Sequence, residues 1–112
     1  MIRGASYSYA MELRVAEQVM RSGLVGRRRR YRVDLHGVSV FGPGDGHTLI
    51  RWERIETIAG RADDGVRVES ATAAVVFPRG AFGLDPPALA AQLEAARSID
   101  RRGQIIAELA GG

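Results

Sequence analysis

The sequence contains no cysteine and no lysine. Without cysteine, the 112-residue chain cannot build a disulfide framework, a cysteine-ligated zinc site or a cysteine nucleophile. Without lysine it cannot form a lysine Schiff base with a carbonyl substrate, and all 16 of its basic residues are arginine. These two absences exclude several classes of enzyme before any motif is considered.

Long apolar runs are absent as well. The apolar and nearly uncharged stretch at residues 70–78 is about half of the roughly 20 residues that a membrane-spanning helix needs. Residues 1–6 carry an arginine but no apolar segment behind it, so we expect no signal peptide. The sequence therefore predicts a cytoplasmic protein with no transmembrane segment.

The charge of the chain is smaller and less even than its isoelectric point indicates. The pI of about 10.2 accompanies a net charge of only +3, because no lysine titrates near pH 10 and arginine alone keeps the pI high. Residues 1–36 hold eight arginines against three acids, whereas residues 37–85 hold five against seven. The basic excess is concentrated in the run Arg27-Arg28-Arg29-Arg30.

The length of the chain predicts a single domain. Alternation of apolar and polar residues predicts strands along its first two thirds. The clearest strand is Arg28–Leu35, with Tyr31, Val33 and Leu35 on one face and arginines on the other. Val15 and Val19 instead fall at helical spacing, so a short helix is predicted over residues 15–24. Further strands are expected at residues 7–14, 38–41, 47–52, 66–69 and 73–77, with turns at 36–37, 42–46, 62–65 and 71–72.

Two segments change the pattern. Trp52, Ile55 and Ile58 lie three residues apart, so residues 52–58 form either a helical turn or a bent strand that crosses the sheet. Asp85 is predicted to cap a helix whose first turn contains two prolines. A second helical segment is expected at Ile99–Ala110.

The centre of the chain resembles a known family. Val38-Ser39-Val40-Phe41, a glycine loop and then Leu49–Ile58 resemble the "strand, strand, W-x-x-I-x-x-I" centre of bacterial pleckstrin-homology (PH)-like domains. Residues 75–82 are similar to the "hydrophobic-hydrophobic-x-P-[KR]-x-x-F" segment before the final helix in the YcxB-like branch of that group.

The resemblance implies an α+β, mainly β fold. It would be a strongly bent antiparallel sheet, a partly open barrel or two near-orthogonal sheets, capped by a C-terminal helix. Trp52, Ile55 and Ile58 would lie in the core, Pro78 would end the last strand, and Phe82 would anchor the turn into the helix. The chain departs from the branch by lacking its usual transmembrane pair and by continuing beyond the expected end. We therefore expect a PH-like domain at residues 1–97 and a C-terminal helical extension at residues 98–112.

The arginine-rich segment is the first candidate site. Clustered guanidinium groups bind phosphate in a bidentate manner, so this segment is a candidate anion-binding surface for nucleic acid or acidic lipid headgroups. Alternatively, strand alternation simply places its arginines on a solvated face opposite Glu12. No aromatic residue that would stack on bases is expected on that face, because Tyr31 points to the other side. The candidate anion-binding residues are Arg27, Arg28, Arg29, Arg30 and Arg32.

Other polar clusters are explained by turns and solvated faces. The loop Gly42–Gly46 leads into a strand and lacks the Gly-Lys-Ser/Thr of a phosphate loop, so we expect a hairpin. The pairs Asp34/His36 and Asp45/His47 offer metal-ligand types but flank turns and complete no coordination shell. Asp63-Asp64 and the pair Glu53/Glu56 fit a turn and an exposed face. We expect no metal, no cofactor and no catalytic activity.

The C-terminal segment is the second candidate site. Its apolar residues need a surface beyond the one that Leu89 and Leu93 cover, which indicates either an interface or folding back onto the same core. The candidate partner-binding residues are Ile99, Ile105, Ile106 and Leu109. The sequence therefore predicts a non-enzymatic PH-like binding or assembly module that contacts a protein partner or a second copy. The alternative is an anion-binding domain that recognises nucleic acid or an anionic membrane surface through its arginine-rich strand.

Overall fold

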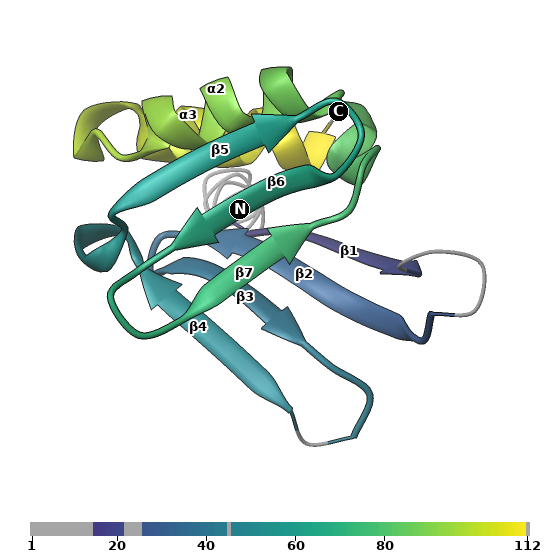
Figure 1. Cartoon of the computed structure of the whole chain (residues 1–112). Coiled ribbons are helices and arrows are strands. Elements are labelled where there is room, and N and C mark those ends of the chain that lie inside the picture. Colours follow the sequence, from purple (N-terminus) through teal and green to yellow (C-terminus); the bar gives the residue numbers. More distant parts are fainter. Residues whose placement is uncertain (1–14, 22–25, 45, 112) are drawn as a thin grey trace, which may run out of the picture.

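The protein is an α+β structure, mainly β, with two antiparallel sheets followed by two helices (Figure 1). The computed structural model describes residues 15–21, 26–44 and 46–111. The expected strand at residues 7–14 lies outside the described residues. Among the described residues, no helix has the length and apolar character that crossing a membrane requires.

The first sheet is a four-stranded meander in which each strand pairs with its neighbour in sequence. The predicted hairpin is present, but its two-residue turn is 35–36 and not 36–37, so Leu35 lies in the turn and is exposed instead of sharing the buried face of Tyr31 and Val33. The Asp34 carboxylate accepts hydrogen bonds from the backbone N–H groups of His36 and Gly37 at 2.9 and 3.2 Å. The loop at residues 42–46 joins the next two strands, as expected. The strands are β1 (Val15–Arg21), β2 (Arg28–Asp34), β3 (Gly37–Phe41) and β4 (His47–Arg51).

The helix predicted over residues 15–24 is wrong, because Val15–Arg21 is strand β1. All seven of its residues pair with β2. Val15 and Val19 are four residues apart, and an even spacing puts two residues on one face of a strand as well as on one face of a helix. The intervening Ala16, which faces the core and is fully buried, shows that the true period is two.

A short 3₁₀ helix (η1, Trp52–Arg54) carries the chain from the first sheet to the second. The helical alternative is therefore confirmed for residues 52–54, whereas Ile58 already belongs to a strand of the second sheet. Trp52 is buried, and its indole Nε1–H donates to the backbone oxygen of Asp34 at 2.8 Å, which ties the crossing to the β2–β3 turn. Ile55 is also buried, and Ile58 packs partly buried against the core.

The second sheet has three antiparallel strands, β5 (Thr57–Arg61), β6 (Gly65–Glu69) and β7 (Ala74–Phe77), in sequential order. Pro78 follows β7 directly, as predicted, since proline cannot donate to a ladder. The two sheets enclose a common core but are not hydrogen-bonded to each other, so the described strands do not close a barrel.

The two helices lie beside β5, away from β4 (Figure 1). After a second 3₁₀ turn (η2, Ala81–Gly83), helix α2 (Pro86–Ala96) begins as predicted. The Asp85 carboxylate accepts the backbone N–H of Ala88 at 2.9 Å. Leu89, Leu93 and Ala96 are buried on one face of α2.

Helix α2 packs unusually closely on β5 at Gly60. A Cβ atom at Gly60 would lie 2.4 Å from the carbonyl oxygen of Pro86 and 2.9 Å from the Cβ of Ala90. Both distances are shorter than van der Waals contact. The absence of a side chain at residue 60 therefore sets how near the helix approaches the sheet.

Helix α3 (Ile99–Gly111) packs against α2 and β1 and belongs to the same core as the sheets. Two arginines fix the α2–α3 junction. The Arg97 guanidinium donates to the backbone oxygen of Ile55 at 3.0 Å. That of Arg102 donates to the oxygen of Ala96 at 2.8 Å and lies 4.9 Å from the centre of the Trp52 ring. The helix pair is thus attached to the crossing between the sheets.

Candidate binding surface

The arginine run does not form a single cluster, because strand β2 sends its side chains to both faces of the sheet. Arg28, Arg30 and Arg32 share the outer face, which points away from the core, while Tyr31 is buried on the inner face. Arg29 lies on the same side as Tyr31, and Arg27 precedes the strand and is exposed. Three of the five candidate residues therefore share one surface.

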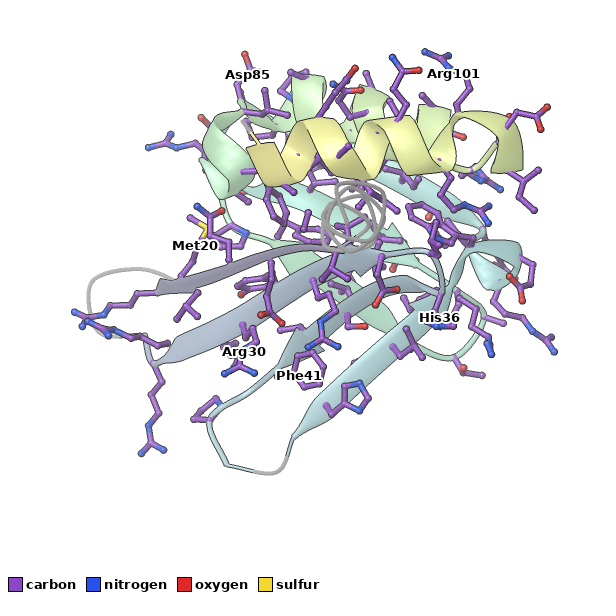
Figure 2. The ribbon with its side chains drawn as sticks, turned by 180° about the vertical axis from the view of Figure 1, so that it is seen from behind. Met20, Arg30, His36, Phe41, Asp85 and Arg101 are labelled. Carbon is purple, nitrogen blue, oxygen red and sulfur yellow. The ribbon has the colours of Figure 1, made fainter. Side chains whose placement is uncertain are left out.

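The register of the sheet brings further residues onto this surface. Arg30 lies between Val19 of β1 and Phe41 of β3, and Phe41 lies opposite His47 of β4. Figure 2 shows Arg30 and Phe41 on neighbouring strands on the same face of the sheet. We define the outer row as five residues, the four in this cross-strand row and Arg32 beside them: Val19, Arg30, Phe41, His47 and Arg32.

Phe41 is contacted by cationic and aromatic groups from both neighbouring strands. The rings of Phe41 and His47 are stacked, with centroids 4.5 Å apart and planes 5° from parallel. The Arg32 guanidinium carbon lies 4.9 Å from the Phe41 centroid. The side chains form a continuous stack across β2, β3 and β4, with the His47 side exposed.

The expectation that no aromatic residue lies on the arginine face is wrong. Strand β2 alone has only Tyr31 as an aromatic residue, whereas Phe41 and His47 come from the next two strands. The signal that could have revealed this pairing is the exact position of the turn, which lies one residue before the predicted 36–37. A two-residue turn at residues 35–36 places Asp34 opposite Gly37, and counting back from that pair places Arg30 opposite Phe41.

Arg32 is held in place by an acid on β1. Its Nε and Nη2 groups donate to one carboxylate oxygen of Glu17 at 2.9 and 2.8 Å. Glu12, the expected partner, lies outside the described residues. An ion pair this exposed contributes at most about 1 kcal/mol to stability, so its main effect is to fix the guanidinium beside Phe41.

The other outward-facing arginines of this sheet have no such partner in the part of the chain that the structure describes. Arg28, Arg30 and, on β4, Arg51 are exposed and lie more than 4.0 Å from any described carboxylate. Their charges remain available to an external anion. Exposed apolar side chains, Val15, Val19 and Leu49, lie on the same face.

The outer face of the second sheet differs, because its charges are paired. Arg67 contacts Glu69 at 2.9 Å, and Arg61 lies 3.9 Å from Asp64. The hydrogen bond from Arg67, together with its positive charge, lowers the pKa of the Glu69 carboxyl. This face therefore neutralises itself, and the excess positive charge of the sheets lies on the face of β1–β4.

A cleft of about 450 Å³ between β2 and the β5–β6 turn is lined by three further basic residues. Arg21, Arg29 and Arg79 line it together with Asp63 and Asp64. The two carboxylates offset much of the positive charge, so this cleft is a weaker candidate for an anion than the outer face.

The polar pairs considered for metal binding or catalysis are separated by the fold. His36 lies in the turn before β3, and His47 lies on β4 opposite Phe41 at the far end of β3, a strand whose four residue steps span about 13 Å. The described residues contain no group of three or more metal-ligating side chains, and Asp45 lies outside them. Asp63 and Asp64 occupy the β5–β6 turn, and Glu53 and Glu56 are exposed.

The C-terminal candidates are mostly used inside the fold. Ile105, Ile106 and Leu109 are buried, at 3%, 0% and 5% exposure, where α3 meets β1 and α2. Ile99, at 77%, is exposed at the start of α3. Of the two interpretations of this segment, folding back onto the same core describes three of its four apolar residues.

No protein-family model, no curated protein and no solved structure matches the chain. What the outer face binds is therefore inferred from its own residues.

Proposed function

We propose that the protein is a non-enzymatic, PH-like binding domain that recognises a phosphate-bearing ligand through the outer face of β1–β4. One observation carries the proposal. Arg28, Arg30 and Arg51 are exposed on one face of one sheet, and no described carboxylate neutralises them. Guanidinium groups bind phosphate oxygens through two parallel hydrogen bonds, so this face suits an anionic ligand.

The architecture supports the PH-like part of the proposal. Two antiparallel sheets and a C-terminal helix packed against β5 and β6 are what the resemblance implies. Trp52 and Ile55 are buried, and Phe82 is buried in the turn before α2.

The anionic ligand is favoured over self-association through the C-terminal segment, because that segment's apolar residues are covered. Ile105, Ile106 and Leu109 already contact the chain's own core. The arginines of β2, in contrast, remain exposed.

The test compares two charge-matched variants. Arg28→Gln/Arg30→Gln removes two charges from the outer face, and Arg54→Gln/Arg101→Gln removes two exposed charges elsewhere (Figure 2 labels Arg101 on α3). Fluorescence anisotropy would follow binding to inorganic polyphosphate and to a single-stranded oligonucleotide, and co-sedimentation would follow binding to phosphatidylserine vesicles.

We expect the first variant to weaken binding of at least one probe by roughly tenfold or more, because two guanidinium groups no longer bind phosphate. The salt dependence should also become shallower by about 0.7 to 0.9 for each phosphate that the variant no longer neutralises. The control variant should bind within about twofold of wild type. Equal weakening by both variants, or no binding of any probe by wild type, would overturn the proposal.

A further inference from the structure

The outer row carries more than charge, because it presents a stacked aromatic pair beside the arginines. A ligand recognised only through phosphate would use Arg28, Arg30 and Arg51 and would have no use for Phe41 and His47. We propose that the ligand is a single-stranded nucleic acid whose bases stack on the Phe41–His47 pair while the arginines of β2 hold its phosphates. This inference rests on the proposed function and specifies its ligand.

The stacked side chains form a platform that a further ring can extend. Phe41, on β3, is contacted by Arg32 from β2 and by His47 from β4, so both faces of its ring are occupied. His47 is exposed and uses one ring face for Phe41. A further aromatic ring can stack on the other face of the His47 ring.

A nucleobase fits that position for a chemical reason. Every base has a flat π-face, and stacking on an aromatic side chain tolerates any base sequence. Neighbouring strands are about 4.8 Å apart, so Arg30 on β2 lies roughly 10 Å from His47 on β4. This distance suits a strand that places a phosphate at Arg30 and a base at His47.

Apolar side chains border the platform. Val19 is 55% exposed beside Arg30, and Leu49 is 42% exposed two residues after His47. They offer apolar contacts to sugars and base edges next to the stack. The face thus combines guanidinium groups, aromatic rings and small apolar surfaces, the combination that single-strand binding requires.

Other anionic ligands use less of this surface. A lipid headgroup carries phosphate but no aromatic face. In a nucleic-acid duplex the base faces are stacked on one another, so the rings of the platform cannot reach them. A single strand presents phosphates and base faces together.

The experiment separates stacking from charge. Anisotropy would compare wild-type binding of a fluorescein-labelled ten-nucleotide oligouridylate with that of an abasic ribose-phosphate oligomer of equal length. We expect a preference of about 5- to 140-fold for the oligouridylate, which is the 1–3 kcal/mol of one stacked base at about 1.4 kcal/mol per tenfold.

Variants then locate the preference. Phe41→Leu/His47→Gln keeps polar and apolar character but removes both rings, and it should bind the two oligomers equally. His36→Gln changes the histidine at the other end of β3 and should keep the preference. Arg30→Gln should weaken both oligomers by a similar factor. Circular dichroism would confirm that each variant is folded, and the wild-type comparison decides the question even if one variant is not.

Equal wild-type affinity for the two oligomers would overturn the stacking inference and leave phosphate recognition standing. Binding of phosphatidylserine vesicles without binding of either oligomer would likewise overturn it in favour of a membrane ligand. If no anionic probe binds, the proposed function fails together with the inference.

Discussion

Replacing Gly60 with alanine tests how closely α2 approaches β5. The added Cβ would lie 2.4 Å from the Pro86 carbonyl oxygen, whereas ordinary contact begins at 3.4 Å, so the helix must retreat by about 1.0 Å, the difference between the two distances. Leu89 and Leu93, exposed by only 1% and 0%, would then pack less closely against the sheets.

The expected magnitude is a difference of two effects. Overpacking of this kind costs about 1–3 kcal/mol, and alanine in a strand interior is worth about 0.5–1 kcal/mol more than glycine. We therefore expect Gly60→Ala to lower the free energy of unfolding by up to about 2.5 kcal/mol. With an unfolding entropy of about 2.1 cal/mol/K per residue over 112 residues, this corresponds to a Tm lower by up to about 11 °C.

The assay is thermal and urea unfolding followed by the fluorescence of Trp52, the single and buried tryptophan. The matched control is Gly103→Ala in α3, where an added Cβ meets nothing within 4 Å. That change should raise the stability by about 1 kcal/mol, since glycine is unfavourable in a helix interior. A Gly60→Ala protein that is as stabilised as Gly103→Ala would refute the close approach of α2.

Two further changes test the core and the surface charges. Ile106→Ala should lower the free energy of unfolding by about 2–5 kcal/mol in a urea titration, because this fully buried side chain belongs to the core. Light scattering should show an unchanged association state. A shift to smaller species would instead place Ile106 in an interface. Arg67→Gln should raise the pKa of Glu69 towards its ordinary value, as an NMR titration would show. A lowered carboxyl pKa contributes stability above its unfolded-state value and loses it as the pH falls through the folded-state value. The stability deficit of Arg67→Gln should therefore be present at neutral pH and vanish in acid, and a deficit independent of pH would contradict the ion pair.

Local chemistry predicts much of this fold. The Asp34 turn, the glycine loop and the Asp85 cap each act within a few residues of chain. The structure has the loop and the cap where the sequence places them, and the turn one residue earlier. The error at β1 arose where a spacing of four residues fits both a helix and a strand. Only pairing with β2, a tertiary contact, decides between them.

The binding surface could be predicted only in part for the same reason. Alternation within β2 places Arg28, Arg30 and Arg32 on one face. The stack of Phe41 and His47 depends on how three strands are aligned. The pattern of residues within one strand carries no information on that alignment. Whether Ile106 meets a partner or its own chain depends on β1 being near α3, and the spacing of residues along α3 does not show this.

The attachment of β1 has a consequence for synthesis. The side chain of Gln18 accepts a hydrogen bond from the backbone N–H of Phe82, which is 64 residues further along the chain, and α3 covers the same strand. The strand pairings of the four-stranded sheet, in contrast, all join neighbouring strands and can form as each hairpin leaves the ribosome. Strand β1 is thus the first described strand to be made and the last to be covered. A nascent chain that stalls before α3 would display its arginine face while the inner face of β1, with Ala16, still lacks its cover.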